Sequence, residues 1–102
     1  MDMNDLMQQA QMMQMELARA QEEIKEITFT ATVGGGMVSA TALGDGTVQS
    51  ISIKPEVIDP DDPEMLQDLV LAAVNEALRG VSEQGSARLS SVTGGMSIPG
   101  LF

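Results

Sequence analysis

The apolar positions of the chain repeat with a helical period near both ends and with a period of two in between. From residue 63 to residue 92 apolar side chains recur three and four positions apart, which predicts a long amphipathic helix. Asp62 suits the N-cap of this helix, and Pro63 suits its first position because proline has no N–H to leave unpaired there. The apolar stripe is too wide for a solvated helix, so the helix should pack on the segments that precede it.

Residues 3–27 are predicted to form another helix, and this one carries an unbroken heptad repeat. Each of its two seam positions is apolar throughout: Met3, Ala10, Leu17 and Ile24 occupy one, and Leu6, Met13, Ala20 and Ile27 occupy the other. A repeat of 3.5 residues held this long favours a supercoiled contact with another helix. A methionine-rich stripe is also more typical of a packing surface than of a cofactor site.

Between the helices the alternation predicts three strands of an antiparallel meander, at residues 28–33, 37–43 and 47–53. Gly44-Asp45-Gly46 supplies the positive-φ positions of a tight hairpin, and Val48 is out of phase, which indicates a bulge. Residues 93–102, rich in glycine and proline, are predicted to be irregular. The chain is therefore expected to be one α+β domain over residues 1–102, with the element order α-β-β-β-α.

The predicted helices are longer than the predicted strands. Strands of about seven residues span ~23 Å, whereas the helices should span ~36 Å and ~45 Å. The beginning of the first helix and the end of the second should therefore overhang the sheet as an antiparallel helical arm. A three-stranded sheet also has two open edges, so we expect a homodimer. The arm and dimer contacts are assigned to apolar residues of the two helices, namely Met3, Leu6, Met13, Leu17, Ile24, Leu89 and Val92.

Composition excludes several classes of function. There is no His and no Cys, and no activated nucleophile is visible, so we expect neither an enzyme nor a cofactor nor a small-molecule substrate. The absence of cysteine fits a reducing compartment, and the chain shows neither a signal peptide nor a membrane span, which favours the cytoplasm. Asp59, Asp61 and Glu64 resemble a Ca²⁺ cluster, but the glycine and the distal glutamate of an EF-hand loop are missing, so no metal is predicted.

The order of elements, together with three stretches of sequence, resembles the YbaB/EbfC family of small bacterial nucleoid-associated proteins. The stretches are GDG before VQSISIKP, then PEMLQDLVLAAVNEAL, then SSVTGGMSIPGLF, and the resemblance covers essentially the whole chain. It implies a tweezer-like homodimer with projecting helical arms that binds duplex DNA with little sequence preference. It also implies a genomic association with recombinational repair.

The charge departs from what DNA binding requires, because phosphate contacts depend on Lys and Arg. Five basic residues stand against fifteen acidic ones, a formal net charge of −10. Residues 6–15 and 84–102 contain no acidic side chain, so DNA contact is expected at the arms and should be weak. Arg88 has no acidic residue within four positions and is the first candidate for DNA binding; Arg19, Arg79 and Lys25 lie close to carboxylates and rank below it.

Two alternatives to DNA binding remain open. The acidity favours a protein-interaction module whose arms grip a partner, such as a DNA-repair protein. A structural homo-oligomer without any ligand is the remaining possibility. Salt-dependent DNA binding would separate the first hypothesis from these two, since phosphate contacts weaken steeply as salt rises.

Overall fold

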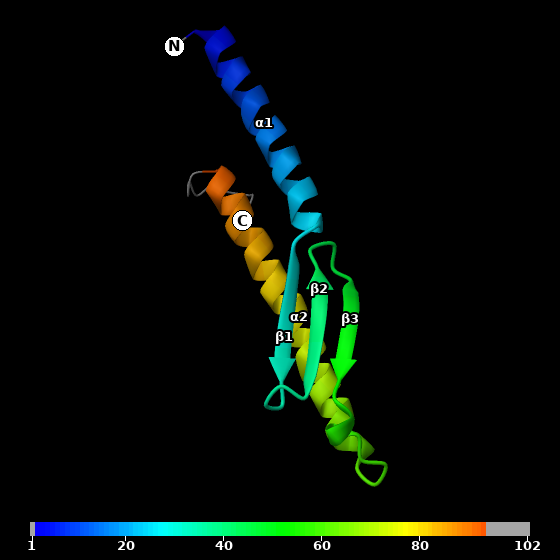
Figure 1. The fold of residues 1–102 in the computed structure, drawn as a ribbon. Helices are drawn as coiled ribbons and strands as arrows, with labels where there is room; N and C mark the ends of the chain where they lie inside the picture. Colours follow the sequence, from blue (N-terminus) through cyan, green and yellow to red (C-terminus); the bar gives the residue numbers. More distant parts are fainter. Residues whose placement is uncertain (1, 94–102) are drawn as a thin grey trace.

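The computed structural model describes residues 2–93 (Figure 1). The elements are α1 (Met3–Lys25), β1 (Thr28–Val33), β2 (Val38–Leu43), β3 (Val48–Ile53), a short 3-10 turn η1 (Pro55–Val57) and α2 (Pro63–Val92). The predicted fold class and element order are confirmed. Of the tail predicted to be irregular, residues 94–102 lie outside the described part of the chain.

The helix ends follow from local hydrogen bonds. The Asp62 carboxylate accepts from the Met65 N–H at 3.3 Å, so the predicted N-cap of α2 is confirmed. α1 ends at Lys25, two residues before its predicted end. The N–H groups of Glu26 and Ile27 donate to carbonyls three residues earlier, which tightens the last turn. The Ile27 carbonyl then accepts from the Gly44 N–H at 2.8 Å and so begins the sheet instead of continuing the helix.

The sheet is an antiparallel meander in the order β1-β2-β3. Thr41 pairs with Ser50, whereas Ala42 pairs with Val48, so one extra residue is inserted in β3 at this point. The bulge predicted from the phase of Val48 is confirmed. The turn between β2 and β3 uses Gly46 at φ 89°, as the hairpin prediction requires.

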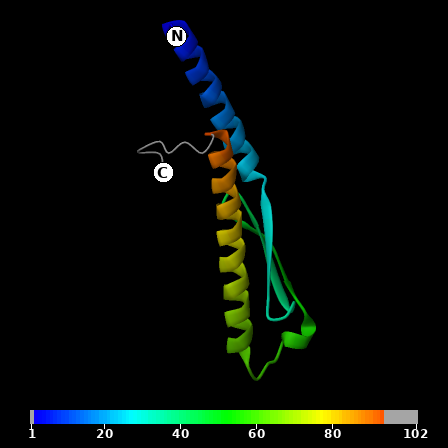
Figure 2. The same ribbon diagram turned by 90° about the vertical axis from the view of Figure 1, so that its left-hand side faces the viewer.

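α2 covers one face of the sheet and packs on β1 and β2, with little contact to β3 (Figure 2). The buried core is made almost entirely of small side chains: Ala31, Val38, Ala40, Ala42, Val57, Ala73, Ala77 and Val81. Small residues allow helix and sheet to approach closely, and a Cβ on Gly80 would lie 2.4 Å from the ring of Phe29. The other face of the sheet presents hydroxyl groups, of which those of Thr30 and Thr41 are 2.7 Å apart.

The molecule is elongated, 72 × 22 × 17 Å, because α1 continues past the end of α2 (Figures 1 and 2). Gly85 of α2 lies against Ile24 of α1, and only about two helical turns of α2 remain beyond it. The end of α2 therefore pairs with the second half of α1. The prediction that the end of α2 pairs with the beginning of α1 is wrong within one chain, and the first half of α1 projects alone.

Candidate nucleic-acid interface

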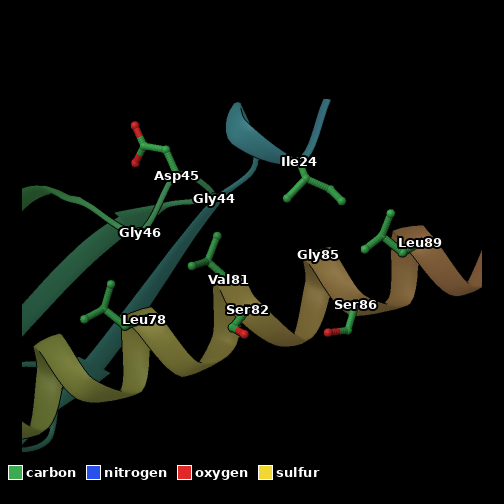
Figure 3. Close-up of a pocket in the computed structure, with 10 residues that line it drawn as sticks. All are labelled: Ile24, Gly44, Asp45, Gly46, Leu78, Val81, Ser82, Gly85, Ser86 and Leu89. Carbon is green, nitrogen blue, oxygen red and sulfur yellow. The ribbon is translucent and has the colours of Figure 1, made fainter. Parts of the chain in front are cut away.

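Three segments meet where α1 leaves the sheet: the end of α1, the turn between β2 and β3, and α2. Figure 3 shows Ile24 above Gly85, with Val81 and Leu89 along α2 on either side. A Cβ on Gly44 would lie 1.6 Å from the Ile24 carbonyl oxygen, so the turn touches the α1 backbone directly. The three segments surround an open hollow of about 450 Å³. Within the described residues no buried side-chain polar atom lacks a hydrogen-bond partner, so none points to a bound ligand.

Asp45 stands at the rim of this hollow and stabilises the turn. Its carboxylate accepts from the Thr47 hydroxyl at 2.6 Å and from the Thr47 N–H at 3.0 Å. These hydrogen bonds favour the charged form and lower the pKa of the Asp45 carboxyl below its ordinary value. Asp45 therefore stabilises the turn locally, because both hydrogen bonds that its carboxylate accepts come from Thr47 of the same turn.

Arg88 is not the unpaired cation that its sequence neighbourhood predicts. Its Nε donates to Glu23 Oε2 of α1 at 2.9 Å, across 65 residues of sequence. No acidic residue lies within four positions of Arg88 in the sequence, but the packing of α2 against α1 brings Glu23 to Arg88. The prediction that Arg88 carries an unneutralised charge is wrong for this reason.

Two other candidate cations are neutralised within their own helices, as their sequence neighbours indicate. Arg79 pairs with Glu76 and, at 3.8 Å, with Glu83, and these carboxylates raise the pKa of the Arg79 guanidinium, Glu76 having the larger effect. Lys25 pairs with Glu22 at 3.2 Å. Both pairs are solvent-exposed helix pairs, which contribute little to stability.

Arg19 forms no ion pair within residues 2–93, although carboxylates lie near it in the sequence. It lies in a shallow recess on α1 beside Met12, Met15 and Glu16. Glu23 is one turn further along the same side of α1. The structure thus pairs Glu23 with Arg88 of α2, and Arg19 lies one helical turn from Glu23 on α1.

The part of α1 beyond this cluster combines apolar exposure with an absence of charge. Residues 6–15 carry no charged side chain. Met3 is 75% exposed and Leu6 is 49% exposed, so the described part of the chain does not cover either of them. The remaining residues assigned to helix packing are half-buried: Met13, Leu17, Ile24, Leu89 and Val92.

A second apolar surface lies on α2 and was not assigned from the sequence. Gly80 faces Phe29 of β1, so helical periodicity places Leu71 and Val74 on the opposite flank, toward β3. Leu71 is 61% exposed, and Ile51 of β3 is exposed as well. Two features of the sequence pointed to such a surface, the wide apolar stripe of α2 and the open edge of the sheet. The sequence alone could not show that α2 leaves β3 uncovered. We call this surface the α2–β3 flank, defined by Leu66, Val70, Leu71, Val74 and Ile51.

A cluster of acidic residues in the sequence, between residues 56 and 68, lies at the end of the molecule opposite the α1 N-terminus (Figure 1). Six of the fifteen lie between residues 56 and 68, and two of them have structural partners: Asp59 accepts from the Asp61 N–H, and Asp62 caps α2. Among the described residues no three acidic groups come together as a metal site would require. None of the helices in residues 2–93 has a stretch long and apolar enough to cross a membrane.

These features define a class of small, elongated α+β proteins with a projecting helical arm that is uncharged from residue 6 to residue 15. The chain belongs to the YbaB/EbfC DNA-binding family, whose model matches residues 1–96. A nucleoid-associated protein of Acetivibrio thermocellus is 56% identical over 102 residues, which is 99% of this chain and 90% of that protein. A nucleoid-associated protein of Clostridium acetobutylicum is 54% identical over 100 residues, 98% of this chain and 89% of that protein.

The fold also recurs in a solved structure. The crystal structure of an uncharacterized protein from Helicobacter pylori matches with a TM-score of 0.70 at 26% sequence identity. The match covers 91% of this chain and 98% of that one. The resemblance noted from the sequence is therefore confirmed at the level of family and fold.

Proposed function

We propose that this protein is a homodimer that binds duplex DNA weakly and with little sequence specificity, in the cytoplasm on the nucleoid. The family and the nucleoid-associated relatives support DNA as the ligand. The observation that carries the proposal is the arm itself: Arg88 of α2 reaches α1 at Glu23, Arg19 lies one turn along α1, and residues 6–15 of α1 carry no charged side chain. A phosphate backbone can approach there without first meeting the acidic end of the molecule.

The dimer is proposed to form through the α2–β3 flank. Leu71 and Val74 line an apolar groove on α2, and the outer edge of β3 has no neighbouring strand among residues 2–93. An exposed groove beside an open strand edge is a surface that oligomers commonly bury. Two subunits joined at this flank would present two α1–α2 pairs to one duplex, as the tweezer-like arrangement requires.

Weak binding follows from the number of cations. Each phosphate neutralised contributes a slope of about −0.9 to the dependence of log K on log salt. Arg19 and Arg88 of two subunits would neutralise at most four phosphates, so a slope no steeper than about −4 is expected. The Kd should lie toward the non-specific range, on the order of 10⁻⁴ to 10⁻⁶ M. Base-specific readout needs several polar side chains placed together on an element that fits a groove, and we propose that the arm does not present them in this way, so sequence preference should be small.

The test is fluorescence anisotropy with a labelled duplex across a salt series that starts at low ionic strength. Wild type should bind, and Arg88→Glu should bind more weakly. Arg79→Glu is the matched control, because it makes the same charge change in the same helix at a cation already held by Glu76 and Glu83. Equal binding by wild type and Arg88→Glu would contradict the arm as the contact site.

The concentration of acid between residues 56 and 68 favours one other function, an acidic module that binds a protein, for example one that acts in DNA repair. In either case the chain would act by binding and not by catalysis. Failure of wild type to bind DNA even at low salt would make this second function the leading one. A pull-down at physiological salt would then separate it from a structural homo-oligomer.

A further inference from the structure

We infer that Glu23 is an internal competitor for DNA phosphate, which occupies Arg88 until a phosphate displaces it. The inference rests on the proposed function, because it concerns the same arm and the same ligand. In this inference the negative charge of Glu23 lowers the affinity of the arm for DNA below the affinity that the arginines alone would give.

The contacts of Arg88 show how the competitor is held. Nε donates to Glu23 Oε2 at 2.9 Å, and Nη1 donates to the Ser91 hydroxyl at 3.0 Å. The Ser91 hydroxyl in turn donates to the Arg88 carbonyl at 2.7 Å. Ser91 therefore fixes the guanidinium from the α2 side independently of Glu23. The arginine stays in place when its carboxylate partner leaves.

The pair is open to solvent on both sides. The side chain of Arg88 is 38% exposed and that of Glu23 is 47% exposed, so a phosphate oxygen has access to the guanidinium. Guanidinium binds carboxylate and phosphate with the same planar donor geometry. An exposed ion pair is also weak, which makes the exchange of one anion for the other readily reversible.

Arg19 is a second cation on α1 that would favour phosphate over the Glu23 carboxylate. It lies one turn from Glu23 on α1, on the same side of the helix, and forms no ion pair in the described part of the chain. A phosphate that replaces the Glu23 carboxylate at Arg88 would therefore lie about one helical turn of α1 from a second cation. In the proposed exchange Arg88 supplies the first contact and Arg19 adds to it from α1.

The exchange of the Glu23 carboxylate for phosphate would also change the contact between α1 and α2. Within residues 2–93, Glu23–Arg88 is the one ion pair that joins α1 to α2, since the other pairs lie within a single helix. A phosphate at Arg88 would remove that link. By reciprocity, any change that breaks the link should raise the affinity for phosphate.

Two substitutions at Glu23 separate competition from positioning. Glu23→Gln keeps an oxygen that can accept from Arg88 Nε but removes the charge, whereas Glu23→Ala removes both. A competitor predicts tighter DNA binding in both variants, by about two- to fivefold for each Arg88 engaged, the range of an exposed ion pair. A positioning residue predicts no change in Glu23→Gln and weaker binding in Glu23→Ala.

The matched control is Glu26→Gln, which makes the same change in net charge near the same end of α1. Glu26 forms no ion pair among the described residues. Anisotropy titrations at one low salt concentration should show a gain in Glu23→Gln and Glu23→Ala that clearly exceeds the gain in Glu26→Gln. Adding Arg88→Gln to Glu23→Gln should abolish that excess.

The outcomes distinguish this inference from the proposed function. If wild type binds and Glu23→Gln matches Glu26→Gln, the inference is overturned and the function stands. If Glu23→Ala binds more weakly than wild type, Glu23 positions Arg88 and the inference is likewise overturned. If neither wild type nor Glu23→Gln binds DNA, both are overturned. Binding by Glu23→Gln but not by wild type would support the inference and show that the Glu23–Arg88 ion pair keeps phosphate from Arg88 in wild type.

Discussion

The two halves of α1 carry the same heptad repeat but have different surroundings. In the second half, Ile24 lies against Gly85 of α2, Leu17 is half-buried, and Ala20 is completely buried. In the first half, Met3 and Leu6 occupy the equivalent seam positions and remain exposed. The difference teaches that a heptad shows which side of a helix needs a partner, while the length of the partner decides how much of that side is covered.

Charge follows the same division. The exposed half of α1 is uncharged from residue 6 to residue 15, whereas the packed half carries six charged side chains between residues 16 and 26. Lys25 and Glu23 of the packed half are held in ion pairs. The packed half therefore has its seam covered by α2 and part of its charge paired, whereas the exposed half presents uncovered apolar side chains and no charge from residue 6 to residue 15.

The largest effect is expected where the packed half joins the sheet. Gly44→Ala should destabilise the protein by about 3 kcal/mol, because its Cβ would overlap the Ile24 carbonyl oxygen and backbone cannot move aside as a side chain can. Gly35→Ala is the control: it has open space but a φ of +67°, so it should cost about 1 kcal/mol. Urea unfolding followed by circular dichroism measures both, and an equal loss would contradict the close contact.

A charge placed in the heptad seam of each half should tell the two halves apart. Leu17→Asp places a carboxylate between α1 and α2 and should lower the free energy of unfolding by about 2 kcal/mol or more. Leu6→Asp, in the exposed half, should change it by no more than about 0.5 kcal/mol. Denaturant midpoints give the comparison. A large loss in Leu6→Asp would show that another chain covers the first half of α1.

The proposed dimer interface on the α2–β3 flank can be tested separately from the first half of α1. Leu71→Asp on the α2–β3 flank should raise the dimer dissociation constant about tenfold or more, which sedimentation velocity over a concentration series would show. A wild-type chain that stays a folded monomer at micromolar concentration would contradict the dimer. Combining Leu71→Asp with Leu6→Asp in a double-mutant cycle should give additive effects, because the two surfaces are separate.

The smallest effect concerns two arginines that differ in their partners. Arg19→Gln should weaken DNA binding about threefold and reduce the salt slope by about 1, since it removes one phosphate contact. Arg79→Gln should leave DNA binding unchanged, because Glu76 and Glu83 already neutralise that guanidinium. The ratio of the two affinities in one anisotropy series is the measurement. Equal losses would indicate that net charge alone decides binding.

The order of elements could be predicted from the sequence because its signals are local. The alternation in β1, the Asp62 cap and the phase of Val48 each depend on neighbours a few residues away, and each was confirmed. The end of α1 was placed two residues too far, because the bond between the Ile27 carbonyl and Gly44 depends on the sheet.

The candidate site was harder to predict because it depends on contacts between distant segments. Arg88 looked unpaired, as no acid stands near it in the sequence, and Arg19 looked paired, as several do. The structure reverses both assignments, since an antiparallel helix contact brings Glu23 to Arg88. Sequence neighbours predicted the ion pairs of Arg79 and Lys25 correctly, because those pairs lie within one helical turn.

The distance between the acidic end and the arm changes what a net charge of −10 means for a polyanionic ligand. At physiological ionic strength the Debye length is about 8 Å, and even at 0.01 M it is about 30 Å. The molecule is 72 Å long, and the carboxylates of residues 56–68 lie at the end opposite the arm (Figure 1). Phosphates at the arm are therefore screened from the carboxylates of residues 56–68, whose repulsion acts on approaches that lead with that end. The acidity of that end then selects the orientation of encounter, and the strength of the final contact depends on the charges nearer the arm, which include the acidic residues of α1 itself.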